Sequence, residues 1–116
     1  MRICCRLSTV LHMTQTTGGN AATAGRLVLL RHGQTVWSES GQHTGRTDIP
    51  LTAEGERQAR DAGTRIQTAF PQGFGENCVY ASPLKRAQQT ASLAGFAPRT
   101  LPALAEWDYG RACLLY

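Results

Sequence analysis

The sequence predicts an α/β fold built on a parallel sheet, and three observations support that prediction. Two short apolar runs, residues 27–30 and 78–81, have the length and composition of buried strands. Each run is followed by a segment in which apolar residues recur at helical spacing. A chain of 116 residues suits one small domain. In the order strand, helix, strand, helix, each helix connects two strands that run parallel in the sheet.

The first 25 residues are expected to be a flexible lead-in, with the folded part starting near Arg26. Residues 14–25 consist mainly of Thr, Gln, Gly, Asn and Ala, which offer little apolar surface to bury. Polar residues such as Arg6 and His12 interrupt the apolar residues before them, so no signal-peptide core forms. Residues 26–116 make up the predicted domain.

The next segment, residues 33–45, lacks a sustained apolar period, which predicts a short helical turn followed by a loop. A long helix is then expected from residue 53 to about residue 70. Thr52 is placed to cap it, and Glu54 lies in the first turn, where a carboxylate suits the helix dipole. The apolar face of this helix consists of Gly55, Ala59, Ala62 and Ile66.

The second strand, residues 78–81, is short and is expected to be buried. Pro83 is placed to open the next helix, because proline is favoured at the first helical position. The apolar stripe of that helix consists of Leu84, Ala87, Ala91 and Ala94. Residues 101–104 are a candidate for a third, short strand.

The charge distribution argues against a nucleic-acid-binding protein. The formal net charge is +4, but residues 1–26 hold three of the 12 basic side chains and no acidic one. The predicted domain is therefore close to neutral, and its adjacent Lys and Arg residues are limited to Lys85-Arg86. Nucleic-acid-binding domains gather Lys and Arg on one face, so nucleic acid is not an expected partner.

The four cysteines, Cys4, Cys5, Cys78 and Cys113, show neither C-x-x-C spacing nor a metal-ligand spacing with histidine. Reduced thiols in the cytoplasm are expected rather than a disulfide framework, with Cys78 buried in its strand. No metal site is expected. No apolar stretch approaches the roughly 18 residues that a membrane span needs, so a membrane is not an expected partner either.

The end of the first strand is the strongest candidate for a functional site. Residues 27–30 lead directly into Arg31 and His32, where a neutral imidazole can act as a nucleophile and the guanidinium can bind phosphate. Arg86 lies in the first turn of the later helix, whose N–H groups favour an anion. Open α/β sheets bind ligands at the carboxyl ends of their strands, so both arginines and His32 are expected to converge on one phosphate.

Several motifs in one order resemble the histidine phosphatase superfamily, to which phosphoglycerate mutases and many broad-specificity phosphatases belong. The resemblance runs from about Arg26 to Gly110 and so covers most of the chain. The motifs are Arg31-His32-Gly33-Gln34-Thr35 with Trp37, Thr44-Gly45 with Asp48, Pro50-Leu51-Thr52 with Gly55 and Gln58-Ala59, and Tyr80-Ala81-Ser82-Pro83-Leu84 with Arg86-Ala87 and Thr90-Ala91. This resemblance implies the three-layer, parallel-sheet α/β fold of the phosphoglycerate mutases.

The resemblance also implies roles for individual residues. His32 matches the histidine that takes the phosphoryl group, and Arg31 and Arg86 match two arginines of the phosphate pocket. Glu106 looks like the acid that protonates the leaving oxygen and later activates water. Weaker matches to positions that contact substrate in some members are Ser38, Thr44, Gly45 and Tyr109. The family needs no metal, and no cofactor is expected.

The chain also departs from the family pattern. Members carry a second active-site histidine well beyond the position of Glu106, whereas the other two histidines here, His12 and His43, precede it. Residues 111–116 form an abrupt apolar end in place of the family's continuation, as in a truncated or frame-shifted product. We therefore expect only the amino-terminal part of the fold, with an exposed sheet edge that favours self-association or a homodimer.

The predicted function is hydrolysis of a phosphomonoester through a phosphohistidine intermediate, with a small phosphorylated metabolite as substrate. A phosphatase is favoured over a mutase because the surroundings of Ser38 and His43 lack the asparagine-rich pattern of the glycolytic mutases. The activity of this short chain is left open. One alternative is a catalytically dead phosphate-binding or interaction fragment, and another is an unstable translation product.

Overall fold

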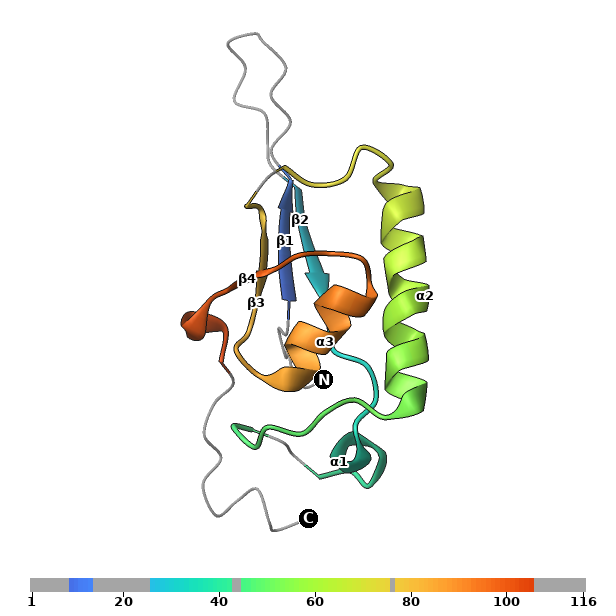
Figure 1. Ribbon diagram of the computed structural model, residues 1–116, viewed down its shortest axis with the longest axis vertical. Helices are drawn as coiled ribbons and strands as arrows, with labels where there is room; N and C mark the ends of the chain where they lie inside the picture. The colour runs from blue at the N-terminus through green and yellow to red at the C-terminus, as the bar shows by residue number, and fades with distance from the viewer. Residues whose placement is uncertain (1–8, 14–25, 43–44, 76, 106–116) are drawn as a thin grey trace, which may run out of the picture.

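The computed structural model describes residues 9–13, 26–42, 45–75 and 77–105 (Figure 1). Its elements in chain order are β1 (Thr9–Met13), β2 (Arg26–Leu30), α1 (Val36–Glu39), α2 (Ala53–Ala69), β3 (Val79–Ala81), α3 (Lys85–Leu93), β4 (Arg99–Thr100) and the 3₁₀ helix η1 (Pro102–Leu104). The α/β class is confirmed, as is the order of strand, helix, strand, helix from β2 onward. Among the described residues, no helix is long and apolar enough to cross a membrane.

The strands form one sheet in the order β2-β1-β3-β4. Strand β1 pairs antiparallel with both β2 and β3, so these two strands run in the same direction on either side of it. Strands β3 and β4 are parallel. The register aligns Leu29, Val10, Tyr80 and Arg99 in one row across the sheet.

Strand β1 is the main departure from the sequence prediction, which assigned a flexible lead-in to all of residues 1–25. Residues 9–13 instead form the strand between β2 and β3 (Figure 1). Thr9 has as register partners Leu30 on one side and Ala81 on the other, so its pairing is long-range. Strand formation that depends on distant partners leaves little local signal in a sequence. The ends of β2 and β3 are consequently not direct neighbours in the sheet.

Strand β2 is less buried than its apolar composition predicts. Leu27 and Leu29 are 58% and 47% exposed, whereas Val28 and Leu30 are half-buried. This alternation is typical of a strand with one covered and one open face. Helices α2 and α3 lie side by side on the covered side of the sheet (Figure 1).

Helix α2 confirms the predicted cap and boundaries. The Thr52 hydroxyl accepts a hydrogen bond from the Gly55 N–H at 3.1 Å, and the helix ends one residue before Phe70. Gly63 is buried although the predicted apolar face omitted it. A Cβ at this position would overlap the backbone of Ala94, so the glycine is what allows α2 and α3 to pack so closely.

Helix α3 begins two residues later than predicted, after Leu84 instead of at Pro83. Leu84 offers no side-chain cap, and the Asp48 carboxylate accepts from the Lys85 N–H at 2.6 Å in its place. Ala87 and Ala91 are fully buried, as the predicted stripe requires.

The last strand and one cysteine also differ from expectation. Strand β4 lies at Arg99–Thr100, and Pro102–Leu104 form η1 instead of a strand. Proline lacks the N–H that a sheet ladder needs, which accounts for the strand stopping before it. Cys78 is half-buried and precedes β3 instead of lying inside it.

Candidate active site

The loop after β2 packs directly against the first turn of α2. A Cβ on Gly33 would overlap the carbonyl of Gly55, and a Cβ on Gly55 would overlap the carbonyl of Gln34. The Thr52 N–H donates to this Gln34 carbonyl at 2.9 Å. The end of β2 is therefore held against α2 by backbone contacts that two glycines make possible.

His32 is buried at the end of β2, with 7% of its surface exposed. Its Nδ1 lies 2.7 Å from the Gly33 carbonyl oxygen. A carbonyl oxygen can only accept, so Nδ1 carries a hydrogen, and when the ring is neutral the lone pair is on Nε2. This is the tautomer that a histidine nucleophile attacking through Nε2 requires.

His32 lines an open pocket of about 260 Å³. Among the described residues, its walls come from the loop after β2, from α1 and from α2, and include Arg31, His32, Gly33, Gln34, Ser38 and Gln58. One guanidinium, an imidazole, two amides and a hydroxyl make a polar wall that suits a small anion. The structure thus brings Arg31, His32 and Ser38 together, as the sequence prediction requires.

Arg86 does not line this pocket. It is 1% exposed, and its guanidinium donates to the carbonyls of Gly45 and Thr47, at 2.8 Å each. Arg86 and Gly45 are therefore in contact with each other, and Arg86 holds the loop that contains Gly45 and Thr47. The expected convergence of two arginines on one phosphate stays a prediction.

Ser38 has a structural partner as well as a place in the pocket wall. Its hydroxyl accepts from the Thr35 N–H at 2.8 Å and donates to the Thr35 carbonyl at 2.9 Å, while its own N–H donates to the Thr35 hydroxyl. These bonds cap α1. A serine hydroxyl has one hydrogen, so contact with a substrate oxygen as a donor would require breaking the bond to Thr35.

Three of the predicted site residues, Thr44, Glu106 and Tyr109, lie outside the described residues. His43 lies outside them too. Their roles remain predictions. Within the described residues, no group of His, Cys, Asp and Glu could hold a metal ion.

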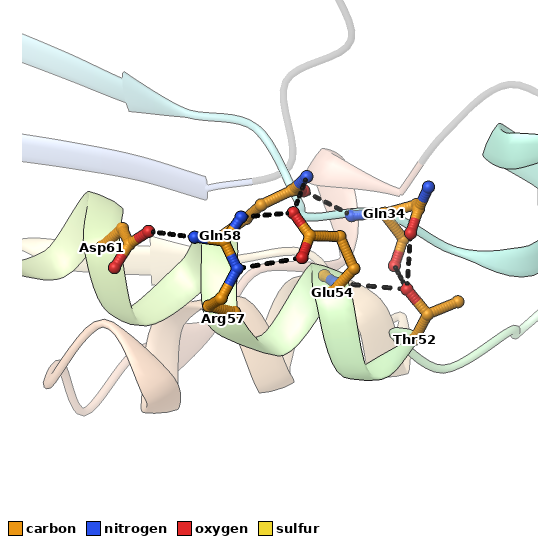
Figure 2. Close-up of polar contacts among 7 residues, drawn as sticks. Gln34, Thr52, Glu54, Arg57, Gln58 and Asp61 are labelled. Carbon is orange, nitrogen blue, oxygen red and sulfur yellow. Dashed lines mark hydrogen bonds and ion pairs between the residues drawn. The ribbon is translucent and has the colours of Figure 1, made fainter.

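Sequence reasoning gave no role to Gln58, although the structure places it in the pocket wall. Gln58 Oε1 accepts from the Gln34 N–H at 3.0 Å, and its Nε2 donates to Glu54 at 3.1 Å (Figure 2). The spacing from Glu54 to Gln58 puts both side chains on one helix face. That spacing, close to the predicted start of the helix, was the sequence signal that Gln58 and Glu54 contact each other.

Glu54 is held in turn by Arg57, whose Nε and Nη2 donate to its two carboxylate oxygens (Figure 2). The hydrogen bond from Arg57 holds the pKa of Glu54 below its ordinary value of 4.5. The hydrogen bond to Glu54 in turn raises the pKa of Arg57. A negative carboxylate is thereby fixed beside Gln58 at neutral pH.

Comparison with known proteins gives a consistent result. The family model of the histidine phosphatase superfamily, branch 1, matches residues 27–113. An acid phosphatase from Mycobacterium tuberculosis is 45% identical over 86 residues, which are 73% of this chain and 41% of that protein. A 2,3-bisphosphoglycerate-dependent phosphoglycerate mutase from Corynebacterium diphtheriae is 40% identical over 87 residues, covering 73% of this chain and 34% of the mutase. The chain thus spans less than half the length of these relatives.

Solved structures agree with the sequence comparison. The structure of the open reading frame Rv3214 from Mycobacterium tuberculosis superimposes with a TM-score of 0.57 at 36% identity, covering 68% of this chain and 40% of the other. The crystal structure of TTHB049 from Thermus thermophilus gives a TM-score of 0.52 at 49% identity, covering 66% and 40%. The chain has the amino-terminal part of this α/β fold, and it belongs to the histidine phosphatase superfamily.

Proposed function

We propose that this chain is a phosphomonoester hydrolase that works through a phosphohistidine intermediate. The observation that carries the proposal is His32, buried beside Arg31 in a polar pocket with its Nδ1 bound to the Gly33 carbonyl. That bond presents the Nε2 lone pair as the nucleophile. The similarity to an acid phosphatase supports hydrolysis, and a mutase would instead return the phosphoryl group to a bound acceptor.

In the proposed reaction, His32 Nε2 attacks phosphorus in line with the leaving oxygen. The N–P bond forms as the P–O bond breaks, while Arg31 donates to the non-bridging oxygens. Glu106 gives its proton to the leaving oxygen, then takes a proton from the water that cleaves the N–P bond and releases inorganic phosphate. Arg86 is proposed to bind the same phosphate, because it matches the second pocket arginine of the family and lies in the first turn of α3.

The substrate is proposed to be a small phosphorylated metabolite. Its contacts, besides the two arginines, are assigned by family resemblance to Ser38, Thr44, Gly45 and Tyr109. The polar walls of the pocket support a small anionic substrate. The cytoplasm is the proposed compartment, supported by cysteines that show no disulfide-like or metal-like spacing.

Hydrolysis of para-nitrophenyl phosphate by the full chain tests the proposal. The expected result is turnover that is abolished in His32→Ala and retained in His43→Ala, the matched loss of a histidine to which no catalytic role is assigned. Quenching in alkaline denaturant should trap phosphate on the wild-type chain and not on His32→Ala, because the N–P bond of phosphohistidine survives alkali and is hydrolysed in acid. Equal turnover in the wild-type and His32→Ala chains would show that His32 is not the nucleophile.

A second candidate function is phosphate binding without turnover. The observation that favours it is a pocket wall whose described residues include Arg31 but not Arg86. This function predicts that orthovanadate or phosphate raises the melting temperature while para-nitrophenyl phosphate is not cleaved. The shift should be lost in Arg31→Gln, because this exposed guanidinium is the cation that the described residues supply to the pocket wall.

A second copy of the chain is the proposed protein partner, through the edge of β2. This five-residue strand lies at one end of the sheet order, and two of its leucines are exposed. Arg26 is its single charged residue, so antiparallel pairing of two β2 strands would place the two arginines at opposite ends. Parallel pairing would set them side by side, which like charges oppose.

A further inference from the structure

The two peptide groups that flank Gly33 are both held by side chains from helices. The Gly33 N–H, which belongs to the peptide group before it, donates to Thr90 Oγ1 of α3 at 3.4 Å. The Gln34 N–H, which belongs to the peptide group after it, donates to Gln58 Oε1 of α2 at 3.0 Å. Glycine is the residue whose flanking peptides rotate most freely, so such contacts have most effect there.

The second of these peptide groups is the one that binds His32. Its carbonyl, that of Gly33, lies 2.7 Å from His32 Nδ1, and its N–H, that of Gln34, is bound by Gln58. The C=O and N–H of a trans peptide point in opposite directions in one plane. Gln58 and His32 therefore hold opposite ends of a single rigid unit, and a rotation that frees one end moves the other.

The orientation of Gln58 is itself determined by its neighbours. Its Nε2 donates to Glu54, and Glu54 is fixed by two hydrogen bonds from Arg57 (Figure 2). Only the amide nitrogen of Gln58 can face a carboxylate and only its oxygen can face an N–H, so the side chain has one consistent orientation. The ion pair on the surface of α2 is thus connected through Gln58 to the His32 loop.

Thr90 makes the corresponding link to α3. The residue is fully buried, and its hydroxyl donates to the Arg86 carbonyl at 2.7 Å. With its hydrogen committed there, the oxygen can only accept from Gly33. The Gly33 bond is long, so Thr90 is the weaker of the two restraints and Gln58 the stronger.

We propose that Gln58 is a positioning residue that sets the tautomer of His32 by fixing the Gly33–Gln34 peptide group, with Thr90 as a second restraint on the same loop. This inference rests on the proposed function only where it predicts catalysis, because the tautomer is a property of the resting protein. Without the Gln58 contact, rotation of the peptide removes the acceptor from Nδ1. The hydrogen then exchanges between the ring nitrogens, and Nε2 loses its lone pair for part of the time.

The test is the share of the Nδ1–H tautomer of His32, measured by long-range proton–nitrogen correlation in the labelled full chain. Gln58→Met keeps the length of the side chain but removes its acceptor and donor. The matched control is Gln67→Met, the same change further along α2 at an exposed position outside this pocket. We expect Nδ1–H to predominate in wild type and Gln67→Met, and to fall in Gln58→Met by about tenfold in the ratio of tautomers, the effect of about one hydrogen bond.

Catalysis supplies the second readout. Gln58→Met should lower kcat for para-nitrophenyl phosphate by up to about tenfold with little change in KM, because the peptide group that binds His32 Nδ1 loses its hydrogen bond to Gln58. Thr90→Val should act in the same direction, with Thr90→Ser restoring the wild-type value. Thr68→Val is the control, because the Thr68 hydroxyl makes the same bond to the carbonyl four residues earlier and lies outside this pocket.

The outcomes separate the two proposals. A tautomer ratio in Gln58→Met that equals wild type overturns the positioning role, whatever the activity. A changed ratio in a chain that never forms phosphohistidine supports the positioning role while the proposed hydrolase function fails. If Thr90→Val does not fold, Gln58→Met still tests the positioning role, because Gln58 is exposed and its replacement leaves the core intact.

Discussion

Single residues determine how closely the His32 loop approaches α2, and Gly33 is the most sensitive of them. Gly33→Ala would drive a methyl group into the Gly55 carbonyl, which is backbone and cannot swing away. We expect it to lower the free energy of unfolding by at least about 2 kcal/mol, the range for forced overpacking, and to reduce phosphate binding. Urea denaturation followed by circular dichroism measures the first effect.

Gly41→Ala is the control for that substitution. Gly41 has a positive φ of 79°, but no atom of the described residues lies within 4 Å of the position a Cβ would take. Its replacement should cost about 1 kcal/mol, from backbone conformation alone. A Gly33→Ala chain as stable as Gly41→Ala would show that the loop can move away from α2, and the close packing would then not define the site.

Glu54 gives a residue-level prediction about pH. Its pKa in the folded chain is below the ordinary 4.5 because of the Arg57 hydrogen bond. A carboxyl group with a lowered folded-state pKa stabilises the fold above its unfolded value, and this contribution is lost as the pH falls through the folded value. The stabilisation that Glu54 contributes to the fold is therefore lost below pH 4.5, and it is fully present at neutral pH.

The expected change in Arg57→Gln is a rise of the Glu54 pKa toward 4.5, followed by the carboxyl carbon shift in an NMR titration. Arg60→Gln is the matched control, because Arg60 pairs with Glu56 on the same helix. If Glu54 titrates identically in wild type and Arg57→Gln, the hydrogen bond from Arg57 is not what lowers its pKa.

At the scale of elements, α3 depends on a cap from outside its own sequence. Asp48 accepts from the Lys85 N–H at 2.6 Å, and the residue before the helix has no capping side chain. Asp48→Ala should destabilise the chain by about 1 kcal/mol, the usual effect of removing a helix cap. Asp61→Ala removes an exposed carboxylate of α2 and should have a smaller effect. Equal effects in urea denaturation would contradict the capping role.

The helices were predictable from sequence, whereas β1 and the position of β4 were not. Thr52 and the apolar period after it gave α2 within a residue, because caps and periodicity are local signals. Strand β1 forms by pairing with β2 and β3, whose residues lie far from it in the sequence. The open face of β2 likewise depends on the arrangement of the sheet, which no local pattern indicates. The same distinction explains why β4 was misplaced: its partner is β3, and only Pro102 marked the end locally.

Among the site residues, Arg31 and His32 line one pocket because both come directly after the end of β2, and their roles stay predictions. The spacing of Glu54 and Gln58 indicated only a shared helix face, and the contact of Gln58 with the Gln34 N–H was not predictable because it joins α2 to a loop 24 residues earlier. The bonds of Arg86 to Gly45 and Thr47 likewise connect segments that no local pattern links. Local chemistry could be inferred from sequence, whereas the connections between segments required the packed structure.

At the scale of the whole molecule, the described sheet has two unequal ends. Strand β4 is two residues long, whereas β2 has five residues and exposes Leu27 and Leu29. A longer, apolar edge without charges in its middle is the kind that pairs with another chain. The strand that delivers His32 to the pocket is thus also the proposed contact between two copies.

Leu29→Lys tests this contact, because a lysine in the middle of β2 would face the same residues of a second copy. Analytical ultracentrifugation of wild type should show an average mass that rises with concentration, whereas Leu29→Lys should remain monomeric over the same range. Leu101→Lys, the same change at an exposed leucine next to β4, should associate like wild type. Association of Leu29→Lys at wild-type concentrations would show that copies meet through another surface, and a monomeric Leu101→Lys would place that surface at the β4 end.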